Sequence, residues 1–315
     1  MIQIEAFDLS PVSANGSTSF VSASKNGILS FGSIDHATGQ ATTLLEPKKE
    51  HKSDITAARF VSLLQQCSSD AYSPQFPSGK VVLTASLDTT IRLWSFESGS
   101  NPQTLTGHTR AVTSVDFLLS TQGREIISTS LDGTLRHWDV STGGAGQLAS
   151  WRFDHPVSAA VTNSSGSKAH VAVRSNSTAP VAIVDLRSKE IIGNLNTPRS
   201  SSPTAIALSI DESKVAIGDA DGLVTLWDTR TSTTAPLVQW QRTEGAAINS
   251  LSFAEENLLV GGADGLPYRA GFIDGTVKVL EEFSSATEEE GEKLVAVVQR
   301  DDLLVCAGGR GWAVY

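Results

Sequence analysis

The sequence is poor in cysteine, in charge and in long hydrophobic runs. Its two cysteines, Cys67 and Cys306, are too few for a disulfide-stapled secreted domain or for a zinc site with four cysteine ligands. No apolar run reaches the roughly 18 residues that a membrane-spanning helix needs, and the first residues, MIQIEAFDLS, lack the basic start of a signal peptide. We therefore expect the protein in the cytoplasm, in the nucleus or in both.

Only 18% of the residues are charged, and acidic residues outnumber basic ones. The 34 Asp and Glu against 24 Lys and Arg give a formal net charge of −10. This charge disfavours nucleic acids and anionic membranes as partners and favours a protein with basic patches. The hydrophobic content of 40% over 315 residues is enough to build a folded core.

Short β-branched and apolar runs recur along the chain, separated by Gly, Asp, Ser, Thr or Asn. Examples are VVLTAS at 81–86, EIISTS at 125–130 and KVAIGD at 214–219. Runs of this length between turn residues are typical of β-strands joined by tight turns, and no stretch keeps the period of an amphipathic helix. The sequence therefore predicts an all-β protein.

A similar strand ending in tryptophan returns at a nearly constant interval. Trp94 and Trp138 lie 44 residues apart, and Trp227 follows after 89 residues, about twice that interval. The turn aspartates Asp221 and Asp264 extend the series, because they lie 43 residues apart. A period of about 40–45 residues with four short strands per unit is typical of a β-propeller, in which four-stranded sheets stack around an axis.

The period predicts seven blades in a single domain. They are expected at about residues 1–45, 46–105, 106–154, 155–200, 201–244, 245–285 and 286–315.

Residues 81–140 resemble a WD repeat. Gly107-His108 precedes a strand, and after a second strand and an Asp132-Gly133 turn a third strand ends in Trp138-Asp139. The resemblance to the WD-repeat family implies a seven-bladed β-propeller that binds other macromolecules on its faces. In that family the N-terminus supplies the outer strand of the last blade, whereas residues 2–8 here look like the first inner strand. We therefore expect an incomplete last blade and the absence of the family's N-terminal extension.

The resemblance also implies a structural tetrad, in which buried polar side chains satisfy one another within a blade. Its members here are His108, Ser128, Asp132 and Trp138. These residue types could instead form a Ser-His-Asp triad, but the chain lacks the G-x-S-x-G turn that presents such a serine. We expect a structural role, no catalytic residues and no enzymatic activity. The second blade offers only a partial version, at His51, Thr84, Asp88 and Trp94.

No metal ion or cofactor is expected. The six histidines include no i, i+4 pair, so the spacing of a helical zinc site is missing. Gly79-Lys80 lies outside any P-loop frame, and no G-x-G-x-x-G motif follows a strand.

One face of a propeller carries the loops before each inner strand and the turns between second and third strands, and we call it the front face. Acidic residues dominate these segments, which favours a basic partner. The candidate contact residues are Asp54, Arg110, Asp219, Asp221, Glu244 and Asp264. An acidic run at 285–293 is either a solvated loop or a further attraction for that partner.

Residues 83–139 are similar to the proteasomal ATPase-associated factor family, the WD-repeat assembly chaperones of the proteasome regulatory particle. The similarity rests on Gly99-Ser100-Asn101-Pro102, on GHTRAVT at 107–113 and on GREIISTSLDGT at 123–134. It implies a scaffold that binds the C-terminal domain of one proteasomal ATPase subunit and holds it until the ATPase ring assembles. We expect a monomer before complex formation.

Two other functions stay open. Trp227, Asp228 and Arg230 resemble the Trp-Asp-x-Arg motif by which some propellers dock on the cullin-4 adaptor, which would make the protein a substrate receptor of a ubiquitin ligase. The protein could also be a general WD-repeat scaffold. The proteins recovered with it from cells would separate these functions.

Overall fold

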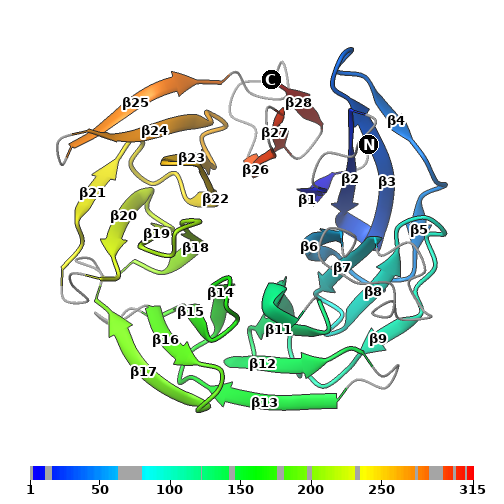
Figure 1. Ribbon diagram of the computed structural model, residues 1–315, viewed down its shortest axis with the longest axis horizontal. Helices are drawn as coiled ribbons and strands as arrows, with labels where there is room; N and C mark the ends of the chain where they lie inside the picture. The colour runs from blue at the N-terminus through cyan, green and yellow to red at the C-terminus, as the bar shows by residue number, and fades with distance from the viewer. Residues whose placement is uncertain are drawn as a thin grey trace.

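The chain folds into a ring of seven β-sheets around a central axis (Figure 1). The computed structural model describes residues 3–10, 16–62, 80–121, 123–141, 146–175, 181–196, 201–230, 235–273, 276–283, 294–300, 303–308 and 311–315. In every sheet the first strand lies next to the axis, the last lies on the outer wall, and neighbouring strands are antiparallel. The predicted all-β class and seven-bladed propeller are confirmed.

The first four sheets each run from an inner to an outer strand in sequence order. The first contains β1 (Ile4–Leu9), β2 (Ser17–Ser24), β3 (Ile28–Asp35), β4 (Ala41–Thr43) and β5 (Lys48–Lys49), of which β4 and β5 both pair with β3. The second contains β6 (Ile55–Ser62), β7 (Lys80–Ser86), β8 (Ile91–Ser95) and β9 (Gln103–Leu105). The third contains β10 (Val112–Phe117), β11 (Glu125–Ser130), β12 (Thr134–Asp139) and β13 (Gly146–Arg152). The fourth contains β14 (Val157–Thr162), β15 (Lys168–Val173), β16 (Val181–Asp185) and β17 (Glu190–Leu195).

The last three sheets complete the ring. The fifth contains β18 (Pro203–Leu208), β19 (Lys214–Asp219), β20 (Leu223–Asp228) and β21 (Val238–Gln241). The sixth contains β22 (Ile248–Ala254), β23 (Asn257–Gly262), β24 (Tyr268–Ile273) and β25 (Thr276–Glu282). The seventh contains β26 (Leu294–Arg300), β27 (Leu303–Gly308) and β28 (Trp312–Val314), so within the described residues it has three strands. Two single turns of 3-10 helix, η1 (Lys25–Gly27) and η3 (Leu119–Thr121), interrupt the loops.

The tryptophans that mark the repeat explain its period. Trp94, Trp138 and Trp227 are each at most 2% exposed. Each side chain lies in the apolar core that its sheet shares with the preceding sheet, as Trp94 does with Phe31 of the first sheet. Since these three tryptophans fill the same place in successive copies of one structural unit, they recur at the length of one blade or a multiple of it.

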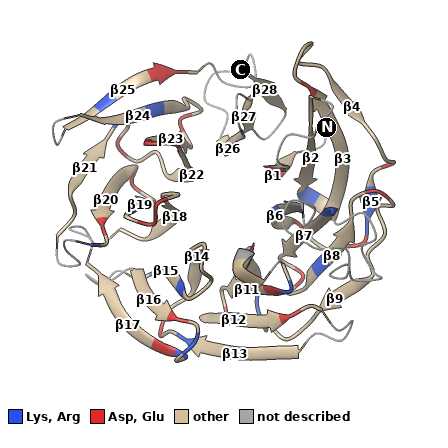
Figure 2. Ribbon diagram, in the orientation of Figure 1, with Lys and Arg blue, Asp and Glu red and all other residues tan. Residues whose placement is uncertain are grey.

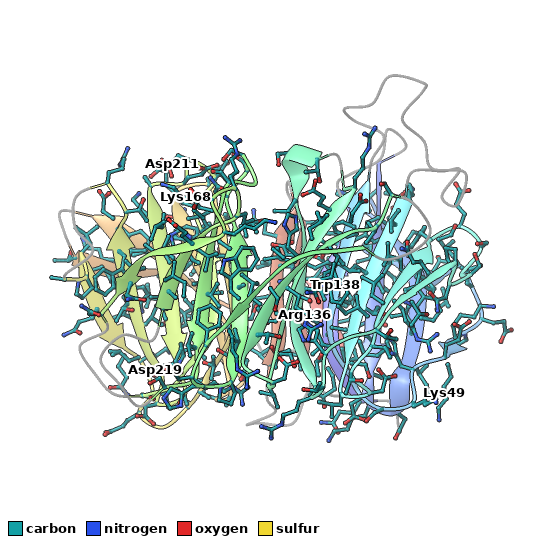
Figure 3. The ribbon with its side chains drawn as sticks, turned by 90° about the horizontal axis from the view of Figure 1, so that it is seen from below. Lys49, Arg136, Trp138, Lys168, Asp211 and Asp219 are labelled. Atoms are coloured by element: carbon teal, nitrogen blue, oxygen red, sulfur yellow. The ribbon has the colours of Figure 1, made fainter. Side chains whose placement is uncertain are left out.

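The ring has two faces, which Figure 3 shows from the side. Inner strands run from the front face to the opposite face, which we call the back face. Asp219 and Lys49 lie on the front side, and Lys168 and Asp211 lie on the back side. No helix in the described segments has the length and hydrophobicity to span a lipid bilayer.

Gln103 stands out among the described buried side chains because it has two polar atoms and no hydrogen-bond partner for either. Gln103, on the outer strand β9, is 4% exposed, and both its Nε2 and its Oε1 are unpaired. Because unpaired buried polar atoms cost free energy, we expect Gln103→Met, which keeps the shape, to raise the free energy of unfolding by about 1–2 kcal/mol. Urea denaturation measures this gain. A matched Gln147→Met change should bring none, since the exposed Gln147 already accepts a bond from Arg136 at 2.7 Å. A loss of stability in Gln103→Met would contradict the expectation.

Candidate protein-binding surface

The third sheet contains a chain of hydrogen bonds through four side chains. His108 Nδ1 lies 2.9 Å from Asp132 Oδ2, and His108 Nε2 lies 2.8 Å from Ser128 Oγ. Trp138 Nε1 donates to the same Ser128 oxygen at 2.8 Å. Ser128 is fully buried, with 0% of its surface exposed, so its hydroxyl cannot reach a substrate. The arrangement fixes the blade and presents no nucleophile to solvent.

The second sheet contains the same chain of bonds, with threonine in place of serine. His51 lies 3.0 Å from the Asp88 carboxylate and 2.8 Å from Thr84 Oγ1, and Trp94 Nε1 donates to that hydroxyl at 2.8 Å. The sequence predicts a partial version here, whereas the structure shows a complete one. Thr84 fits because its Oγ1 makes the same two bonds as the serine hydroxyl of the third sheet, and the whole side chain is buried.

Charge states within both tetrads follow from burial and hydrogen bonding. Burial lowers the pKa of His51 and His108, and the hydrogen bonds that these rings donate to the aspartates only partly oppose it. For Asp88 and Asp132, burial alone would raise the pKa. Hydrogen bonds donated by Thr90 and Thr134, by backbone N–H groups and by the histidines outweigh this effect, and the resulting pKa of each aspartate is about 2. Each tetrad therefore holds a carboxylate beside a neutral imidazole at neutral pH.

Asp219 is not available to a partner, which corrects its assignment to the contact surface. It is 8% exposed, and its Oδ1 accepts bonds from the backbone N–H groups of Asp221 at 3.0 Å and Leu223 at 2.8 Å. Its side chain turns inward because it organises the turn between β19 and β20. Charge reversal at Asp219 would therefore disturb the fold.

Two other candidates are half-buried and engaged within the ring. Asp54 Oδ1 accepts a bond from the Asn26 backbone at 2.9 Å, which ties the second sheet to the first. Asp264 accepts bonds from Thr243 Oγ1 at 2.9 Å and from the Leu266 backbone at 3.2 Å. These two carboxylates serve the front face mainly by holding its turns.

Asp221, Glu244 and Arg110 are the exposed candidates. The structure brings Asp221 and Glu244 together, because the Gly245 backbone donates to the Asp221 carbonyl at 2.9 Å. Asp264 lies beside them through its bond with Thr243. We call Asp221, Glu244 and Asp264 the acidic corner; it joins the fifth and sixth sheets. Arg110 and Asp54 lie across the ring, on the loops before the third and second sheets.

Basic residues also lie on the front face, and the sequence interpretation gave them no weight. Four lysines belong to the side of the first sheet: Lys25, Lys48, Lys49 and Lys52. Figure 2 shows the blue segments there, on the far side of the ring from the fifth and sixth sheets. Charges of both signs are therefore mixed on the side of the first sheet, where Glu46, Glu50 and Asp54 alternate with the lysines, whereas the acidic corner is acidic in all three of its members. The presence of lysines close to the starts of inner strands could have revealed these basic residues from the sequence.

The Trp-Asp-x-Arg motif lies at the back end of the fifth sheet. Trp227 is buried with 0% exposure, and the Asp228 carboxylate accepts a bond from the Arg230 backbone at 2.9 Å and lies 3.6 Å from its Nε. Only the Arg230 side chain is freely presented to solvent, at 67% exposure. The acidic run at 285–293 and Cys67 fall mainly outside the described residues. Burial raises the pKa of the Cys306 thiol to about 12, which keeps it unreactive.

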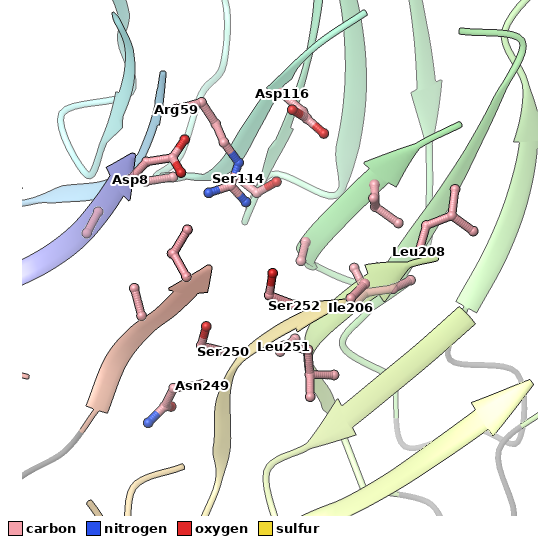
Figure 4. A pocket seen from close by; sticks show the side chains of 18 of the residues that line it. Asp8, Arg59, Ser114, Asp116, Ile206, Leu208, Asn249, Ser250, Leu251 and Ser252 are labelled. Carbon is pink, nitrogen blue, oxygen red and sulfur yellow. The ribbon is translucent and has the colours of Figure 1, made fainter. Parts of the chain in front are cut away.

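A channel of about 1250 Å³ follows the axis, lined by the seven inner strands. Asp8, Arg59 and Asp116 line one side, and apolar residues such as Leu208 and Leu251 line the other (Figure 4). Asp8 is 3% exposed and accepts a bond from the Phe60 backbone at 2.8 Å, so its carboxylate joins the first sheet to the second.

No group of three or more His, Cys, Asp or Glu side chains that could hold a metal ion occurs within the described ranges.

Comparison with known proteins gives two findings. Residues 75–95 and 99–139 match the family described as WD domain, G-beta repeat. The chain is 29% identical over 238 residues to the 26S proteasome regulatory subunit RPN14 of Saccharomyces cerevisiae. The match covers 68% of this chain and 52% of that relative, so the chain spans about half the length of the relative.

Proposed function

Because this chain is a WD-repeat β-propeller similar to a proteasome regulatory subunit, we propose that it is a non-catalytic scaffold of the proteasome regulatory particle. The observation that carries the proposal is the similarity to RPN14 over two thirds of the chain. The buried tetrads agree with it, since their hydroxyl groups serve the fold. We place this scaffold in the cytoplasm, the nucleus or both.

In its finer form, the proposal makes the protein an assembly chaperone of the regulatory-particle base. It binds the C-terminal domain of one ATPase subunit and holds that subunit until the ring forms. The acidic corner at Asp221 and Glu244 is the part of the front face that suits a basic surface on the ATPase. The formal net charge of −10 adds long-range attraction for such a partner.

Docking on the cullin-4 adaptor is not favoured. Of the three motif residues, Trp227 is buried and Asp228 is engaged with Arg230, which leaves one exposed side chain. The matched relative is a proteasome subunit and not a ligase component.

Affinity purification from cells, read by mass spectrometry, tests the proposal. The wild-type protein should recover proteasomal ATPase subunits. The double variant Asp221→Lys/Glu244→Lys should lower that recovery by about tenfold or more, because it places like charges against the basic partner.

A back-face double variant, Glu97→Lys/Glu190→Lys, is the matched control. It changes the net charge by the same amount at two exposed positions, Glu97 in a turn and Glu190 at the start of β17, and should leave recovery unchanged. Equal losses in both variants would remove the acidic corner from the mechanism. Recovery of ligase subunits, or of no proteasome subunit, by the wild-type protein would contradict the proteasome function itself.

A further inference from the structure

All seven inner strands share a backbone irregularity near their start. In each one the pairing register with the second strand shifts around the second residue, as in a β-bulge. The residues at this position are Glu5, Thr56, Thr113, Ser158, Thr204, Asn249 and Val295. A bulge reorients its side chain, and in five of the seven strands that side chain reaches the next sheet of the ring.

Five of these residues form the same hydrogen bond, which we call the latch. The side chain donates to the backbone carbonyl of the first residue in the next inner strand. The latches are Thr56 to Val112 at 2.5 Å, Thr113 to Val157 at 2.9 Å, Ser158 to Pro203 at 2.7 Å, Thr204 to Ile248 at 2.6 Å and Asn249 to Leu294 at 3.0 Å. They join the second through the seventh sheets in an unbroken series.

The series stops on both sides of the first sheet. Glu5, at the boundary between the first and second sheets, is an acceptor when ionised, and Val295, at the boundary between the seventh and first, has no donor at all. The boundary between the first and second sheets has other hydrogen bonds in place of a latch. Asp8 accepts a bond from the Phe60 backbone at 2.8 Å, and Asp54 accepts one from the Asn26 backbone at 2.9 Å.

The boundary between the seventh and first sheets is packed with apolar side chains. Phe7 and Phe20 of the first sheet contact Trp312 of the seventh, with ring centroids 6.1 and 5.4 Å apart, in a cluster that also includes Leu9 and Val305. Apolar packing is non-directional and tolerates sliding, whereas a buried hydrogen bond has to break for its sheets to separate.

We infer that the ring opens between the seventh and first sheets, and that the valine at position 295 makes this boundary the weak one. In a closed array of similar sheets, the total stability is the sum of the stabilities of the sheets and of the interfaces between neighbours. The interface at which the described residues show neither a latch nor a substitute hydrogen bond therefore separates first. Opening there exposes the Phe7, Phe20 and Trp312 rings while the latched sheets stay together.

Native-state thiol labelling measures the opening of one chosen interface. With both native cysteines replaced, Ala307→Cys places a thiol at the seventh–first boundary, and Ala216→Cys places one at the fifth–sixth boundary. Both alanines are 0% exposed, so reaction with a maleimide requires opening. The thiol at position 307 should react at least about fivefold faster, the factor expected for one net hydrogen bond.

Adding or removing a latch should change the labelling rate at its own interface and leave the rate at the other interface unchanged. Val295→Thr, a nearly isosteric change that supplies the donor, should slow labelling at position 307 about fivefold and leave position 216 unchanged. Thr204→Val removes a latch and should speed labelling at position 216. Val161→Thr, which adds a hydroxyl to a channel-lining valine away from the boundary, should change neither rate. Equal labelling at the two positions, or no response of position 307 to Val295→Thr, would overturn the inference.

Discussion

Replacing Asp132 with alanine is expected to lower the free energy of unfolding by about 3–5 kcal/mol. The Asp132 carboxylate accepts bonds from His108 Nδ1, from the Thr109 backbone and from both the backbone and the hydroxyl of Thr134. Its side chain is only 5% exposed, so water cannot replace these bonds without rearrangement of the turn. Alanine leaves four donors without their acceptor and frees the imidazole that orients Ser128.

Urea denaturation of two further variants sets the scale for this loss. Asp139→Ala removes a carboxylate at the end of β12 that, among the residues described, accepts bonds from the backbone and hydroxyl of Ser141 alone, and it should cost no more than about 1 kcal/mol. Ser128→Thr should cost a similarly small amount, because Thr84 fills this place in the second sheet. Equal losses for Asp132→Ala and Asp139→Ala would mean that the tetrad adds nothing beyond an ordinary turn.

The sequence predicts the ring because its signals are local and repeated. Trp94, Trp138 and Trp227 fill the same place at three of the interfaces, so the interval between Trp94 and Trp138 equals the length of one blade and predicts the fold. The spacing from His108 to Asp132 similarly carries the tetrad. These residues contact one another within one sheet or between sheets that are consecutive in the chain. Their spacing in the sequence therefore predicts their neighbours in the structure.

The orientation of a turn residue is harder to predict, and Asp219 shows why. Its position next to a turn suggests an exposed carboxylate, yet it accepts two backbone bonds and points inward. Ser86 and Ser130 precede their turn aspartates by two residues and accept the equivalent backbone bond. Alignment of the blades would have shown Asp219 in this serine position, so the signal was present in the sequence.

The latch residues were missed for a different reason. A single Ser or Thr at the start of a strand predicts nothing, and only the shared bulge shows that the side chain of Ser158 or Thr204 faces the next sheet. The surroundings of Asp221 also need the ring, because Glu244 and Asp264 come from other loops and lie beside it only in the folded chain.

Lowering the pH from 7 to 5 is expected to reduce the free energy of unfolding by at least about 2 kcal/mol. His170, in β15, is 5% exposed, and its Nδ1 has no hydrogen-bond partner. Burial is the main cause that lowers its pKa from 6.5 to about 4; the charge of Lys168 acts in the same direction, and Glu212 opposes the shift. Below pH 6.5 the unfolded chain therefore binds a proton that the folded chain excludes, and stability falls until the pH reaches the folded-state pKa.

The pKa shifts of two further histidines and two aspartates define the pH range in which His170 dominates the change in the free energy of unfolding. Burial lowers the pKa of His51 and His108 as well, so their contributions have the same sign. Asp88 and Asp132 have pKa values of about 2 in the folded state. Their stabilising contribution is lost only below about pH 4, where these carboxyl groups bind protons in the unfolded chain but not yet in the folded one. Between pH 7 and 5 the titration is therefore that of the buried imidazoles.

His170→Leu tests the assignment of this titration, since leucine has no proton to bind and suits the apolar surroundings between the fourth and fifth sheets. Urea denaturation at pH 7, 6 and 5 should show that the variant loses about 2 kcal/mol less than the wild-type protein over this range. The absolute stability of the variant at pH 7 does not matter, because only the difference between pH values reports the proton. A variant whose stability falls as steeply as that of the wild-type protein would show that His170 is solvated or protonated in the fold, contrary to its buried position.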